Sequence, residues 1–168
     1  MTRCFVFLAT IMLSASLGGA ALADSPPSTL TGKMAVFNYL LGTAWQCDSR
    51  TLDTNGKVVR TTKSTVMFDT APSNTLHFHV LSDKVSTDQY IGYVADVDGY
   101  WSTLSNSAGI SMLQTSSDGK NFDGSTTLGS TKVYLSTTYT KVDDSHASVK
   151  MISTINGRQE ESDGTCSR

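Results

Sequence analysis

The sequence lacks the short motifs that mark the common enzyme classes. It contains no G-x-S-x-G nucleophile elbow, no H-E-x-x-H metal helix, no phosphate-binding P-loop and no G-x-G-x-x-G dinucleotide fingerprint. We therefore predict no cofactor and name no catalytic residue.

Charge is also sparse, and no Lys/Arg cluster occurs. Only 13 basic and 15 acidic residues are present in 168, which gives a formal net charge of −2. A basic stripe is the electrostatic mark of a nucleic-acid binder, and a basic cluster that of a protein attracted to anionic membranes. Neither partner is predicted.

Long apolar runs are missing except at the start of the chain. Arg3 is the only charge before Asp24, the stretch from Phe5 to Leu17 is largely apolar, and Ala21-Leu22-Ala23 has the small-x-small form of a cleavage site. The run is shorter than the roughly 20 residues that span a bilayer. We predict a signal peptide over residues 1–23, cleaved before Asp24, and export to the periplasm or the extracellular space. A retained membrane anchor is the alternative, and an integral membrane protein is not expected.

Cysteine is rare, and cleavage leaves only Cys47 and Cys166. An even number of cysteines in an oxidising compartment favours a disulfide. Because the two residues lie near the ends of the folded region, the bond would join its start to its end. A free thiol pair and a pair of metal ligands remain as alternatives, although no C-x-x-C spacing supports either.

The rest of the chain reads as one domain. Residues 24–31 are predicted to be a flexible leader, with Thr31 as a helix N-cap, and residues 32–168 a single β-barrel domain. One short helix is expected, because apolar residues fall at helical spacing and Gly42 can end it: Met34, Phe37, Leu40 and Leu41.

After Gly42 the apolar period changes to two, which is typical of strands. Turn dipeptides separate the apolar segments, among them Asn55-Gly56, Asp98-Gly99, Asp118-Gly119 and Asn156-Gly157, and Asn-Gly is a strong type I′ hairpin signal. Expected strands are Trp45–Ser49, Val58–Thr70, Leu76–Val80, Tyr90–Val97, Tyr100–Leu104, Ile110–Thr115, Asn121–Leu128, Thr131–Thr140, a strand containing Ala147, Val149 and Met151, and Arg158–Cys166. This all-β meander predicts an antiparallel up-and-down barrel of about 8–10 strands, because closure removes the free edges. A two-sheet β-sandwich is the alternative.

The run Phe37-Asn-Tyr-Leu-Leu-Gly42-Thr-Ala-Trp45 resembles the start of calycin-type barrels, the group that includes lipocalins, fatty-acid-binding proteins and nitrobindin-like proteins. Those families usually show G-x-W, whereas this chain has G-x-x-W, with Gly42 and Trp45 one residue further apart. The resemblance implies that Trp45 packs across the barrel floor. It also implies an interior that holds an apolar or amphipathic small molecule.

Six residues are candidate ligand contacts: His77, His79, Tyr90, Tyr93, Trp101 and Tyr139. The two histidines lie two apart on an expected strand and so point to one face, which suits metal ligation. No metal site is predicted, because the third histidine, His146, falls at an expected turn. The aromatic residues line a pocket in one interpretation and are ordinary packing in the other.

Three functions follow, in decreasing order of preference. The first is a carrier or sensor that holds a small ligand in the barrel. The second is a secreted protein-interaction module such as a protease inhibitor, with the leader from Asp24 to Leu30 as its active part. The third is an enzyme with barrel-lining acid–base groups that include His77.

Overall fold

The computed structural model describes residues 29–168. They form one short helix, η1 (Gly32–Leu40), followed by ten strands and a single-turn helix η2 (Ala95–Val97) between the fourth and fifth of them. The strands are β1 (Trp45–Leu52), β2 (Val58–Ala71), β3 (Thr75–Ser82), β4 (Ser86–Val94), β5 (Gly99–Asn106), β6 (Ser111–Ser116), β7 (Asn121–Leu128), β8 (Thr131–Lys141), β9 (His146–Ile155) and β10 (Arg158–Ser167). The signal peptide and most of the leader lie outside the described residues.

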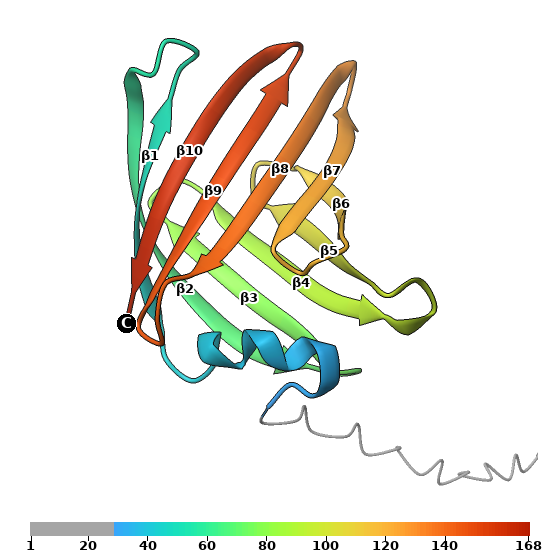
Figure 1. Cartoon of the computed structure of the whole chain (residues 1–168). Helices are drawn as coiled ribbons and strands as arrows, with labels where there is room; N and C mark the ends of the chain where they lie inside the picture. The colour runs from blue at the N-terminus through green and yellow to red at the C-terminus, as the bar shows by residue number, and fades with distance from the viewer. Residues whose placement is uncertain (1–28) are drawn as a thin grey trace, which may run out of the picture.

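The strands form a closed antiparallel barrel in chain order, so the predicted fold class is confirmed and the β-sandwich alternative is wrong. Each strand pairs with its neighbours in sequence, and β1 closes the ring by pairing with β10. η1 lies across one end of the barrel, while only hairpin loops surround the other end (Figure 1). We call these the helix end and the open end. Among residues 29–168 no helix has the length and apolarity needed to span a membrane.

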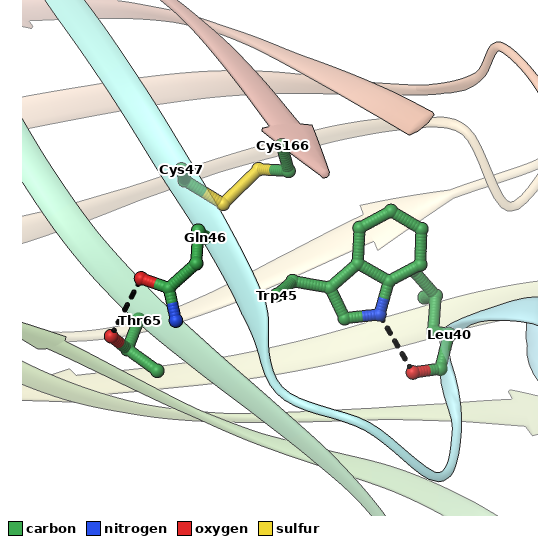
Figure 2. The surroundings of a disulfide bond; sticks show 6 residues. All are labelled: Leu40, Trp45, Gln46, Cys47, Thr65 and Cys166. Carbon is green, nitrogen blue, oxygen red and sulfur yellow. Dashed lines mark hydrogen bonds between the residues drawn. A yellow bond between two sulfur atoms is a disulfide. The ribbon is translucent and has the colours of Figure 1, made fainter. Parts of the chain in front are cut away.

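A disulfide lies at the closing seam. Cys47 and Cys166 are directly opposite partners in the β1–β10 pair, their Cα atoms are 4.1 Å apart, and their sulfurs are bonded (Figure 2). The predicted disulfide is therefore present, and the free thiol pair and the metal-ligand pair are wrong. The bond joins residues 119 positions apart in sequence.

η1 is a 3₁₀-helix rather than the α-helix that the apolar spacing suggested. Met34, Phe37 and Leu40 are buried at intervals of three, which is the period of a 3₁₀-helix, and Leu41 lies beyond its end. Thr31 occupies the N-cap position, but its side chain makes no capping hydrogen bond. Leu30 and Thr31, predicted to belong to the leader, are tied to the fold: Leu30 is only 2% exposed and exchanges hydrogen bonds with the Asn38 side chain.

The apolar core lies at the helix end. Trp45 is fully buried there, and its indole Nε1 donates to the Leu40 carbonyl at 3.0 Å (Figure 2). Its ring also contacts Tyr39 and Phe68 edge-on. Gly42, with φ of 98°, turns the chain from η1 toward β1. Residues from η1 and from most of the strands complete the core: Leu30, Met34, Phe37, Leu40, Val66, Leu76, Phe78, Ile91, Tyr100, Phe122 and Ala147.

Two local predictions need correction. Asn55 does not adopt a positive φ, so Asn55-Gly56 is not a type I′ turn; Asp53 instead organises a longer loop, its Oδ1 accepting the backbone N–H groups of Asn55 and Lys57. The strand expected to reach Val97 ends at Val94, because the chain turns through η2. Asn156-Gly157, by contrast, has φ of 50° and 79° and is the tight β9–β10 turn.

Candidate functional site

The inner face of the barrel can be followed from strand to strand through the pairing register. Residues directly opposite one another in an antiparallel pair project to the same face. Starting from buried Trp45, the inner face of β1 therefore continues through Cys47, Ser49 and Thr51. The same reasoning extends around the ring through pairs such as Cys47–Ser64 and Ser64–Ser82.

The two ends of the interior differ in burial. Trp45, Leu76 and Phe122 at the helix end are completely buried. Toward the open end many inward-facing side chains are partly exposed, which means that solvent reaches them: Ser49, Thr62, Ser64, Ser82, Leu104, Leu135, Ser153, Glu160 and Ser162.

The interior toward the open end has two chemically different walls. We define the hydroxyl wall by the inward-facing residues of β10, β1, β2 and β3: Ser162, Ser49, Thr51, Thr62, Ser64 and Ser82. The aliphatic wall consists of inward-facing residues of β5, β6 and β8: Leu104, Met112, Val133 and Leu135. In the strand order of the barrel, β6 lies halfway around the ring from β1. An amphipathic surface thus lines the interior.

A polar layer separates these walls from the apolar core. Gln89 Nε2 donates to Ser102 Oγ at 2.6 Å, and the Tyr139 hydroxyl donates to Gln89 Oε1 at 3.3 Å. Gln114 Nε2 donates to the Phe122 carbonyl at 3.3 Å and to Thr137 Oγ1 at 3.4 Å. Desolvation in this layer raises the pKa of Tyr139 well above its ordinary value, so its hydroxyl stays protonated.

One acceptor in this layer has no partner. Within residues 29–168, Gln114 Oε1 is the only buried side-chain nitrogen or oxygen that makes no hydrogen bond. An unpaired buried acceptor costs free energy. The polar layer is therefore incompletely satisfied at Gln114.

Arg60 also faces inward, at the start of β2. It lies directly opposite Thr51, and its Nη2 donates to Thr51 Oγ1 at 3.3 Å. Thr51 Oγ1 in turn lies 3.0 Å from Ser162 Oγ. The sequence carries no signal for these three residues, because polar side chains on a strand are usually expected to face solvent outside the protein.

The predicted ligand contacts do not form one site. Tyr93 and Tyr139 are on the inner face, at the helix end, where Tyr93 packs edge-on to Tyr100 and Tyr139 edge-on to Phe122. The other four face outward: His77, His79, Tyr90 and Trp101. The prediction that His77 lines the barrel is therefore wrong, because its register places it opposite Tyr90 on the outer face, and the enzyme hypothesis loses its named acid–base group.

The two histidines share one carboxylate on the outer face. His79 Nδ1 is 2.7 Å and His77 Nε2 3.2 Å from Asp88 Oδ1, and the His77 ring stacks on Tyr90 with 4.5 Å between centroids. Hydrogen bonds from His79 and then His77 lower the pKa of Asp88. No group of three or more His, Cys, Asp or Glu side chains in the described part of the chain is arranged to hold a metal ion.

A hollow of about 620 Å³ opens along β1, β2 and β10. Its charged residues are already paired, Lys63 with Asp48 at 3.7 Å and Arg50 with Asp163 at 3.9 Å. It offers no unpartnered charge to a ligand.

The ring of ten antiparallel strands with a short N-terminal helix is a calycin-like β-barrel, as the start of the sequence predicted. No protein-family model matches the sequence, and no curated protein matches it. Among solved structures, an S-type phycobiliprotein lyase, CPES, from Guillardia theta is similar, with a TM-score of 0.51 and 11% identity over 79% of this chain and 90% of that one. At this identity the likeness establishes the fold alone.

Two further structures are similar at lower scores. A protein of unknown function from the DUF3598 family of Nostoc punctiforme has a TM-score of 0.49 and 12% identity, over 87% of this chain and 53% of that one. A redesigned β-barrel, mFAP0, bound to DFHBI has a TM-score of 0.42 and 15% identity, over 77% of this chain and 99% of that one.

Proposed function

We propose that this protein binds a small amphipathic molecule inside the barrel, between the hydroxyl wall and the aliphatic wall. The observation that carries the proposal is the character of the inward-facing side chains toward the open end. Most members of the two walls are partly exposed, whereas Thr51, Met112 and Val133 are buried, and the polar and apolar walls lie on different strands. Sites for small molecules combine mainly apolar surface with a few placed polar groups, and they often lie at the mouths of β-barrels.

The helix end supports the same location. Trp45, Phe122 and the η1 side chains fill the interior there, so they leave no room for a ligand at the helix end. The polar layer of Gln89, Ser102 and Gln114 would form the floor of such a site.

The alternative, a protein-interaction module acting through the leader, gains no support. Leu30, at the end of that leader, is buried against the barrel instead of being available to a partner. A small-ligand binder therefore remains the preferred function.

The test uses N-phenyl-1-naphthylamine, a neutral apolar dye whose fluorescence rises in apolar surroundings. Leu104→Gln places an amide on the aliphatic wall, and Leu113→Gln makes the same change on the outer face of β6, where Leu113 is 58% exposed. The proposal expects saturable binding by the wild type, weakened about fivefold or more by Leu104→Gln, consistent with roughly 1 kcal/mol or more for a lost apolar contact, and little changed by Leu113→Gln. No saturable binding, or equal effects of the two variants, would overturn it.

We also propose that the protein is exported. The apolar run before Ala21-Leu22-Ala23 and the Cys47–Cys166 disulfide support this, because such bonds persist in oxidising compartments. Expression of the full chain in a bacterial host, with fractionation and intact mass, tests it. A periplasmic or secreted product beginning at Asp24 is expected, and a full-length cytosolic product with three alkylatable thiols would contradict export.

A further inference from the structure

Arg60 is the last residue of the regular β1–β2 register before a shift in the pairing. Thr51 pairs with Arg60, but its neighbour Leu52 pairs with Val58, so Val59 is an extra residue on β2. Without the shift, Val58 and Arg60 would project to the same face, because they are two apart. With it, Val58 lies on the outer face with Leu52 and is 46% exposed, whereas Arg60 keeps the inward position that the regular pairing with Thr51 gives it. Bulges of this kind often redirect a side chain next to a functional site.

Arg60 has unused hydrogen-bonding capacity. A guanidinium carries five N–H donors, and the only hydrogen bond of this side chain within residues 29–168 is the one from Nη2 to Thr51 Oγ1. The Arg60 side chain makes no ion pair in the same part of the chain. Arg50 and Arg168 differ from it: Arg50 faces Asp163, and Arg168 donates to the carbonyls of Asp144 and Leu41.

The surroundings of Arg60 suit an anion. Thr51 is 5% exposed, and Ser162 lies beyond it on the same inner face, so a guanidinium and two hydroxyls lie together at the edge of the hydroxyl wall. The other charged side chains facing inward near the open end are Glu160 and Arg158 on β10. Glu160 forms no ion pair with Arg60, and together these three groups leave a net positive charge.

We infer that Arg60, with Thr51 and Ser162, binds the anionic group of the amphipathic ligand, a carboxylate, sulfonate or phosphate. The apolar part of such a ligand would then lie against the aliphatic wall. Arginine binds such groups through two parallel N–H···O bonds. The single hydrogen bond to Thr51 leaves enough N–H donors of Arg60 for both. This inference rests on the proposed function, because it assigns the ligand's charge to one end of the same site.

The experiment compares two dyes that share an apolar ring system. 8-Anilinonaphthalene-1-sulfonate carries a sulfonate and N-phenyl-1-naphthylamine carries none, and both are titrated into the disulfide-bonded protein. The variants are Arg60→Gln, which removes the charge, and Arg60→Lys, which keeps the charge without the planar fork. Arg50→Gln is the matched control, because Arg50 lies on the outer face of β1.

For Arg60→Gln we expect sulfonate-dye affinity to fall about tenfold and neutral-dye affinity by less than about twofold, the range for one charge-assisted hydrogen-bonded contact. Arg60→Lys should give an intermediate loss and Arg50→Gln none. If Arg60→Gln and Arg50→Gln weaken the sulfonate dye equally, or if Arg60→Gln weakens both dyes alike, the anion site is wrong although ligand binding stands. If the wild type binds neither dye, the proposed function itself fails. Circular dichroism of each variant confirms that the barrel is intact.

Discussion

The indole of Trp101 lies directly on Gly92, its opposite partner in the β4–β5 pair, on the outer face of the barrel. A Cβ atom built on Gly92 would lie 2.5 Å from two ring carbons of Trp101. The glycine therefore provides the space in which the ring packs, and the ring covers backbone that would otherwise be exposed.

We predict that Gly92→Ala displaces the Trp101 ring and lowers the free energy of unfolding by about 1–3 kcal/mol, the usual cost of overpacking. Urea unfolding gives the stability, and near-ultraviolet circular dichroism reports the loss of the fixed indole position. Gly99→Ala is the control, since a Cβ there meets no atom closer than 3.5 Å. Equal stability of the two variants would show that Trp101 does not need the glycine.

The two glutamines of the polar layer should respond differently to replacement by methionine. Gln89→Met leaves Ser102 Oγ and the Tyr139 hydroxyl without their partner, and we expect a loss of about 1–3 kcal/mol. Gln114→Met removes the unpaired Oε1 together with two long hydrogen bonds, so its cost should be smaller. Urea unfolding of both variants measures the difference, and a larger loss for Gln114→Met would contradict the assignment of the unpaired atom.

The disulfide should contribute a large part of the stability. It closes a long segment of the unfolded chain, and removing a native disulfide typically costs about 2–5 kcal/mol. Cys47→Ser combined with Cys166→Ser should therefore unfold at clearly lower urea concentration than the wild type. Adding a reductant should destabilise the wild type and leave the double variant unchanged. A reductant effect on the double variant would mean that the disulfide is not its cause.

Asp118 should make stability depend on pH in the acidic range. Hydrogen bonds from the backbone N–H groups of Asn121 and Lys120 favour the carboxylate and lower the pKa of Asp118 below its ordinary 3.8. The pKa of Asp118 is lower in the folded protein than in the unfolded chain. Its contribution to the free energy of unfolding is therefore complete above the unfolded-state pKa, and it is lost as the pH falls below that value.

Asp118→Asn should therefore be less stable than the wild type near pH 7, and the difference should shrink below about pH 4, where the unfolded-state carboxyl begins to bind a proton. Thermal unfolding from pH 7 down to pH 2 measures it. Asp123→Asn, on the outer face of the following strand, is the control. A stability difference that stays constant with pH would rule out the carboxylate as its origin.

Much of the architecture follows from local pattern. The alternation of Trp45, Cys47 and Ser49 predicts the first strand, and the turn at Asn156-Gly157 has the conformation that its residue types favour. The parity of the cysteines led to the correct disulfide. The turn at Ser73-Asn74, where both residues have positive φ, was not recognised, because only asparagine of this pair is typical of that conformation.

The candidate site was harder to predict, because polarity does not separate inside from outside in this barrel. Ser102 and Gln89 are buried on the inner face, while Leu113 and Tyr90 are exposed on the outer one. Aromatic character therefore does not mark the interior, and Tyr90 and Trp101 face outward. The alternation of side chains in the sequence predicts many of the strands. It does not indicate which of the two faces of each strand encloses the interior.

By itself, the sequence determined a meander of about 8–10 strands in chain order and favoured a disulfide between Cys47 and Cys166, because strand formation depends on local residue types and an even number of cysteines favours pairing. Only the tertiary structure decided that Arg60 faces inward beside Thr51 and Ser162. That placement depends on the register in which β2 pairs with β1, because a register that differed by one residue would move the side chain to the opposite face without changing the pattern of the strand that carries it.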